Sequence, residues 1–129
     1  MLRDIDHFIA GEAFSSGGRT GDVFDPNNGG VQARVRLGTS ADLEQAVAAA
    51  REAFPAWAAT NPQRRARVMF NFKALVERNM EELALLLASE HGKVIADARG
   101  VVQRGLEVIE FACGIPHALT GEYTQGAGP

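Results

Sequence analysis

Arg104 is the residue whose type and setting most directly suggest chemistry. It stands between Gly100 and Gly105 in a predicted helix. A glycine inside a helix costs about 1 kcal/mol relative to alanine. Two glycines at this cost suggest that another backbone or a ligand approaches the helix closely here. The planar guanidinium could hold a carboxylate through two hydrogen bonds. A solvated or ion-paired helix residue is the simpler interpretation of Arg104, and both stay open at this point.

Cys113 and the histidines are the other side chains with catalytic or metal-binding chemistry. A cysteine can act as a nucleophile beside a base, but Cys113 lies late on an apolar helical stripe, so we predict a small buried hydrophobe. His7, His91 and His117 stand alone in the sequence, which predicts surface or cap residues. Because neither H-x-x-x-H nor C-x-x-C occurs, we predict no metal site and assign no catalytic residue.

The segment Glu90-His91-Gly92-Lys93 could be a charged site, but its order is typical of a helix end. Gly92 suits a left-handed cap, and Lys93 would lie near the negative end of the helix dipole. No G-x-G-x-x-G follows a predicted strand, and no G-x-x-x-x-G-K-[ST] occurs. We therefore assign no cofactor-binding residue in this chain.

Composition excludes several classes of protein. The 129 residues include 13 basic and 16 acidic side chains, a formal net charge of −3, which argues against a nucleic-acid-binding surface. One cysteine rules out an internal disulfide framework and indicates a reducing compartment. No apolar run approaches the roughly 20 residues that cross a bilayer, and the N-terminus lacks a signal-peptide apolar region. We expect a cytoplasmic protein with no membrane partner.

The elements that must position these residues fall into two segments. Residues 1–38 predict a β-rich N-terminal segment with short runs, which its turn formers favour as antiparallel, at 7–10, 22–25 and 31–37. Residues 39–129 predict three amphipathic helices and a polar tail from Thr120. The helices begin near Thr39 (capped with Asp42, or by Ser40), at Asn61-Pro62, where Asn79 is a possible break, and near Val94.

Several motifs, in order, resemble the N-terminal part of the aldehyde dehydrogenase superfamily. They are residues 7–11, Asp25-Pro26-x-x-Gly29, 46–57, 64–67 and Glu90-x-Gly92-Lys93. Residues 97–110 and 121–123 are similar to the CoA-acylating methylmalonate-semialdehyde dehydrogenases. The chain departs from their pattern at Val101, where an acid is usual, and at Asp25, where an asparagine usually precedes the proline.

The resemblance implies an α/β superfamily fragment: short antiparallel β-segments followed by three helices, with the Rossmann core missing. The family's oxyanion-hole Asn, its general-base or structural Glu and its nucleophilic Cys then lie downstream, so Cys113 is not that nucleophile. The resemblance also implies that Arg104 binds the distal carboxylate of a small-molecule semialdehyde. A guanidinium in a narrow apolar tunnel could grip that carboxylate and orient the aldehyde carbon.

The implied function is that of an N-terminal fragment of an NAD-dependent, CoA-acylating (methyl)malonate-semialdehyde dehydrogenase-like oxidoreductase. The full-length family uses NAD, with CoA as co-substrate, and is expected to form homo-oligomers. We expect neither NAD nor CoA to bind residues 1–129, and we expect this chain alone to be inactive. The alternative is a non-catalytic truncated remnant or a subunit-interaction module that docks through edge strands.

Overall fold

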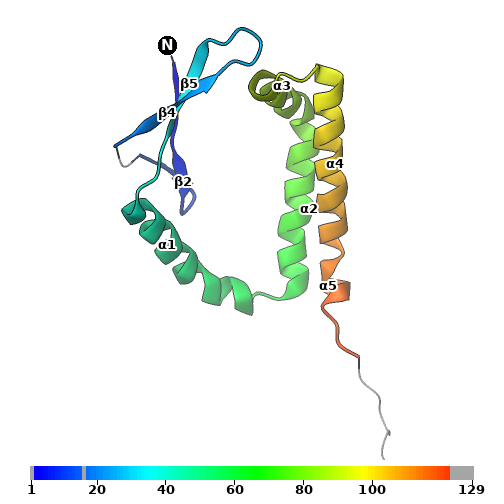
Figure 1. Ribbon diagram of the computed structural model, residues 1–129. Coiled ribbons are helices and arrows are strands. Elements are labelled where there is room, and N and C mark those ends of the chain that lie inside the picture. Colours follow the sequence, from blue (N-terminus) through cyan, green and yellow to red (C-terminus); the bar gives the residue numbers. More distant parts are fainter. Residues whose placement is uncertain (1, 16, 123–129) are drawn as a thin grey trace, which may run out of the picture. The chain divides into compact units, whose positions relative to one another are not determined.

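The computed structural model describes residues 2–15 and 17–122, in which short strands precede a series of helices (Figure 1). Tyr123 and the rest of the predicted polar tail lie outside the described residues. The strands are β1 (Arg3–Ile5), β2 (His7–Ile9), β3 (Glu12–Phe14), β4 (Thr20–Phe24) and β5 (Val31–Arg36). The helices are α1 (Ser40–Ala59), α2 (Pro62–Arg78), α3 (Met80–His91), α4 (Ile95–Cys113) and α5 (Ile115–Ala118).

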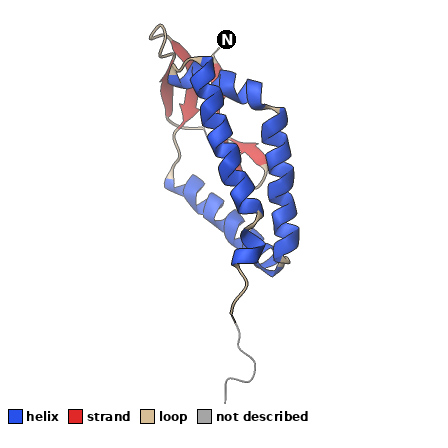
Figure 2. Ribbon diagram, turned by 90° about the vertical axis from the view of Figure 1, so that its right-hand side faces the viewer, coloured by secondary structure: helices blue, strands red, loops and turns tan. Residues whose placement is uncertain are grey.

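The strands form two small sheets, drawn in red in Figure 2. In the larger sheet β5 is central, with β4 antiparallel on one side and β1 parallel on the other. The smaller sheet is the antiparallel β2–β3 hairpin. Antiparallel pairing is therefore confirmed for β4–β5, which correspond to the predicted runs 22–25 and 31–37. The sequence did not predict β1 and β3 as strands; β3 pairs with β2 antiparallel and β1 pairs with β5 in parallel. The parallel pair forms because β2, β3 and β4 all intervene between its strands, which supplies the long connection that parallel strands need.

The turn between β4 and β5 falls between the predicted runs 22–25 and 31–37. The Asp25 carboxylate organises this turn. Its Oδ1 accepts hydrogen bonds from the backbone N–H of Asn27 at 2.8 Å and from the Asn27 side-chain amide at 2.9 Å. Its Oδ2 accepts from the Asn28 amide at 2.8 Å. These hydrogen bonds, above all that from the Asn27 backbone, lower the pKa of Asp25.

The first helix begins with the Thr39–Asp42 cap, one of the two predicted alternatives. The backbone N–H and the hydroxyl of Thr39 donate to Asp42 Oδ2 at 2.7 and 2.8 Å, and the Asp42 N–H donates to Thr39 Oγ1 at 3.3 Å. The apolar stripe of α1 is largely open to solvent in the part of the chain that the structure describes. Its exposed members are Leu43, Val47, Phe54 and Trp57.

The predicted second helix is divided at Asn79 into α2 and α3, and a short helix is added after α4, so the described residues form five helices where the periodicity indicates three. Asn79 caps α2: its side-chain amide donates to the Leu75 carbonyl at 2.7 Å, and its backbone N–H donates to the same oxygen at 3.1 Å. Its own carbonyl accepts from the Leu83 N–H at 3.0 Å in the next helix. The fifth helix is the short α5 after Gly114. The α/β class, with short strands followed by amphipathic helices, is confirmed.

Gly92 ends α3 as predicted. Its φ of +73° is left-handed, and its N–H donates to the Ala88 carbonyl at 2.9 Å. A Cβ at this position would lie 3.1 and 3.2 Å from Cγ and Cβ of Pro26. The backbone conformation and the close packing therefore both favour glycine, and the helix-end interpretation of this segment is confirmed.

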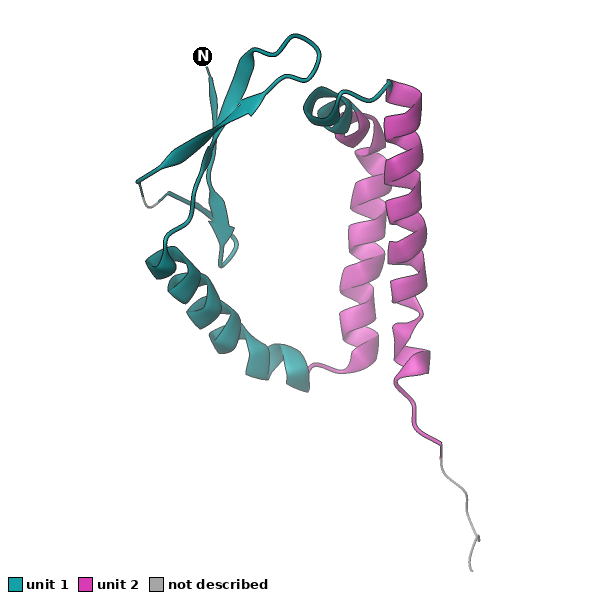
Figure 3. Ribbon diagram, in the orientation of Figure 1, with its two compact units in different colours: residues 1–59, 85–94 teal, residues 60–84, 95–129 magenta. Residues whose placement is uncertain are grey.

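The described residues form two compact units, coloured separately in Figure 3: residues 2–15 and 17–59 with 85–94, and residues 60–84 with 95–122. In the first unit, Arg3 pairs with Glu90 at 2.9 Å, and the Gln32 amide donates to the Ser89 carbonyl at 3.3 Å, which ties the end of α3 to the sheet.

In the second unit α4 packs along α2. Its buried side chains are mostly small: Ala66, Ala84, Ala98, Leu106 and Cys113. Such small side chains let two helices approach closely but bury little apolar area. No helix of the described residues is long and apolar enough to cross a membrane.

Candidate functional site

Arg104 lies on the exposed side of α4. The opposite side carries the predicted apolar positions, of which Ala98, Leu106 and Cys113 are buried. Around Arg104, residues spaced by three and four form a second row, which we call the Arg104 stripe. Its members and their exposed fractions are Val101 at 44%, Arg104 at 82%, Val108 at 63% and Phe111 at 81%. A cation flanked by exposed apolar side chains suits a ligand that has a carboxylate and a short carbon chain.

The two arginines of α4 differ in how their guanidinium groups are occupied. Glu81 holds Arg99 side-on, with Nε at 2.9 Å from Oε1 and Nη2 at 2.7 Å from Oε2. This hydrogen bonding lowers the pKa of Glu81 and raises that of Arg99. The ion pair of Arg104 is longer: its Nε lies 3.5 Å from Glu107 Oε2. Arg104 therefore has more donor capacity left for a ligand than Arg99 has.

The glycines that flank Arg104 have open space around them. A Cβ built at Gly100 or Gly105 would meet no atom of the described residues within 4 Å. The expectation that these glycines admit a second backbone or a ligand thus finds no such neighbour in the part of the chain that the structure describes. Their role in making room for a ligand stays a prediction.

Cys113 is buried near the end of α4, which confirms its interpretation as a small core residue. His91 ends α3, and His117 lies exposed in α5. His7 differs from the expected surface or cap residue, because it is half-buried on β2 and its Nε2 has no hydrogen-bond partner. Among the described residues, no group of three or more His, Cys, Asp or Glu side chains could hold a metal ion.

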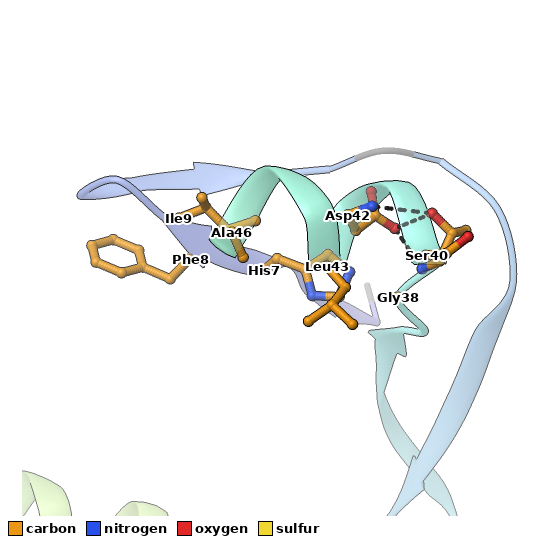
Figure 4. Close-up of a pocket in the computed structure, with 9 residues that line it drawn as sticks. His7, Phe8, Ile9, Gly38, Ser40, Asp42, Leu43 and Ala46 are labelled. Carbon is orange, nitrogen blue, oxygen red and sulfur yellow. Dashed lines mark hydrogen bonds between the residues drawn. The ribbon is translucent and has the colours of Figure 1, made fainter. Parts of the chain in front are cut away.

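A groove between the β2 strand and the start of α1 is a feature that sequence reasoning missed. Its cavity of about 580 Å³ is lined by residues that include His7, Leu43 and Ala46, and Figure 4 shows Phe8 pointing away from α1. The Asp42 carboxylate beside it is already bound to Thr39. The short apolar run at 8–10 and the helical spacing of apolar residues in α1 were the available signals, but pairing the two segments requires the tertiary fold.

Comparisons with known proteins agree with the motif order. The aldehyde dehydrogenase family model matches residues 14–128. A malonate-semialdehyde dehydrogenase of Pseudomonas aeruginosa is 43% identical over 125 residues, which cover 97% of this chain and 25% of the relative. The chain therefore spans about a quarter of the length of the curated relatives it matches.

Solved structures give the same result for the backbone. A protein from Sinorhizobium meliloti 1021, assigned as a methylmalonate-semialdehyde dehydrogenase and complexed with NAD, is 52% identical with a TM-score of 0.94. The match covers 100% of this chain and 26% of that one. The methylmalonate-semialdehyde dehydrogenase of Oceanimonas doudoroffii is 42% identical with a TM-score of 0.95, over 99% of this chain and 26% of that one. Residue pattern and backbone thus point the same way: this chain belongs to the aldehyde dehydrogenase family and follows the N-terminal part of its fold.

Proposed function

We propose that this chain serves as the N-terminal part of an NAD-dependent, CoA-acylating dehydrogenase that acts on malonate or methylmalonate semialdehyde. The names of the similar proteins support this substrate class. The single observation that carries the proposal is the setting of Arg104. Its guanidinium makes one long ion pair, with Glu107, and lies in the middle of an exposed apolar stripe. Residues 1–38 and 39–129 would be two segments of the one larger enzyme.

Arg104 would bind the carboxylate at the far end of the semialdehyde. Two charge-assisted hydrogen bonds from one planar group fix both position and orientation of a carboxylate. Val101 and Val108, one turn away on either side, would contact the short carbon chain. Holding the substrate at both places sets the direction in which its aldehyde carbon points, which is the contribution that positioning makes to catalysis.

The β2–α1 groove does not suit NAD. The β2–α1 groove is lined by the Asp42 carboxylate and by no lysine or arginine that could face a pyrophosphate. We therefore place cofactor and CoA binding, and the nucleophile, outside residues 1–129 and derive no step through them. The same proposal makes the intact enzyme a cytoplasmic homo-oligomer without nucleic-acid or membrane partners.

The test of Arg104 uses a chimera in which this chain replaces the matching quarter of the Sinorhizobium meliloti relative. Arg104→Leu should lower kcat/KM for malonate semialdehyde about 100-fold, since it removes charge-assisted hydrogen bonds worth about 3 kcal/mol. With propanal, which has no carboxylate, the loss should be much smaller. Arg99→Leu is the matched control, because Glu81 already occupies that guanidinium. Equal losses for both aldehydes in Arg104→Leu would remove the carboxylate role.

The second candidate function is a non-catalytic remnant or a subunit-interaction module. The specific observation in its favour is that β1 and β4 are the edge strands of the described three-stranded sheet, and an edge strand can pair with another chain. The nucleotides after codon 129 discriminate the two. A reading frame that continues into a Rossmann core supports the enzyme, whereas a stop codon supports the remnant.

A further inference from the structure

We propose that Glu107 is a positioning residue for Arg104: it engages Nε and so directs the two terminal nitrogens toward the incoming carboxylate. The inference rests on the proposed function of Arg104. Glu107 follows Arg104 by three residues on α4, and its Oε2 lies 3.5 Å from Arg104 Nε. A guanidinium carries donors on Nε and on both terminal nitrogens. With Nε facing Glu107, the Nη1–Nη2 edge is the one that can face a ligand.

The Arg99–Glu81 pair shows what the alternative arrangement looks like on the same helix. There the carboxylate takes Nε at 2.9 Å and Nη2 at 2.7 Å, so it fills a whole edge of the guanidinium. Arg104 and Glu107 make a longer contact through Nε. Glu107 thus lies near Nε of Arg104 without filling an edge of the guanidinium.

Two effects of Glu107 oppose each other. Its negative charge weakens the attraction of Arg104 for another anion, but both side chains are largely exposed, at 82% for Arg104 and 60% for Glu107, so that repulsion is screened. Its contact also restricts a long side chain before the ligand arrives, which lowers the entropic cost of binding. Because the repulsion is screened, we expect the positioning effect to exceed it.

The experiment measures KM and kcat for malonate semialdehyde and for propanal in the same chimera. Glu107→Ala should raise the KM ratio, defined as KM for malonate semialdehyde divided by KM for propanal, about threefold. That change is within the range of an exposed ion pair. Glu107→Gln should fall between wild type and Glu107→Ala, because its amide oxygen can still face Nε. Glu110→Gln is the matched control: it removes the same charge one turn later on α4, from a side chain that pairs with Lys73 at 3.6 Å, and should leave the ratio unchanged.

The double variant separates the role of Glu107 from that of Arg104. In an Arg104→Leu background, Glu107→Ala should change the KM ratio no further, since Glu107 acts through Arg104. A ratio that stays constant or falls in Glu107→Ala, while Arg104→Leu raises it, overturns this inference alone. An effect of Glu107→Ala that persists without Arg104 overturns it as well. A ratio that Arg104→Leu leaves unchanged contradicts the proposed function itself.

Discussion

Replacing Gly92 tests whether the end of α3 needs both a left-handed backbone and close packing on the β4–β5 turn. At φ +73° an alanine costs about 1–2 kcal/mol. Its Cβ would in addition lie 3.1 Å from Pro26 Cγ, so the proline ring must shift. We expect Gly92→Ala to lower the free energy of unfolding by about 2 kcal/mol, which at an m-value of about 2 kcal/mol/M moves the urea midpoint down by about 1 M.

Gly100→Ala is the control with the opposite sign. Gly100 lies inside α4, and a Cβ there would meet nothing within 4 Å among the described residues. Alanine should therefore stabilise the isolated chain by about 1 kcal/mol through its higher helix propensity. Far-UV circular dichroism in a urea series reports both variants. An unchanged or higher midpoint for Gly92→Ala would refute the reasoning.

Gly92→Asn divides the effect into its two causes. Asparagine tolerates the left-handed conformation better than alanine but keeps the Cβ that approaches Pro26. A smaller loss for Gly92→Asn than for Gly92→Ala assigns the difference to the backbone. If Pro26→Ala recovers part of the loss in Gly92→Ala, that part belongs to the packing contact.

Two further predictions concern the chain by itself. The lowered pKa of Asp25 means that its carboxylate stabilises the fold above the unfolded pKa, near 3.8, and that this contribution is lost as the pH falls through the folded pKa. Asp25→Asn should therefore flatten the acid side of a stability-against-pH curve measured by urea unfolding, and an unchanged acid side would contradict this role of Asp25. The isolated 129-residue chain should also produce no NADH from NAD, CoA and malonate semialdehyde, because we place the nucleophile and the cofactor site outside it. Turnover by a homogeneous preparation, measured at 340 nm, would contradict that placement.

Local features of the fold were predictable because the groups that determine them are close in sequence. Thr39 and Asp42 cap α1 across three residues, and Asn61 accepts a hydrogen bond from the Gln63 N–H at 2.8 Å at the start of α2. Gly92 adopts the left-handed conformation that a helix end before Lys93 suggests. The order of the family motifs belongs to the same class of information, since it depends on residue identity and spacing only.

The tertiary structure decided what depends on contacts between distant residues. The parallel pairing of β1 with β5 joins residues about 30 positions apart. A local turn motif therefore cannot predict this pairing. The contact between Pro26 and Gly92 likewise joins residues that are far apart in the sequence, although both belong to the first unit. For the candidate site, the sequence determined that an arginine stands between two glycines. The structure decided that Arg104 lies exposed beside Glu107, and that the carboxylate of Glu81 pairs with Arg99. Hydrogen bonds within a turn are encoded locally, whereas which charges meet depends on how the helices pack.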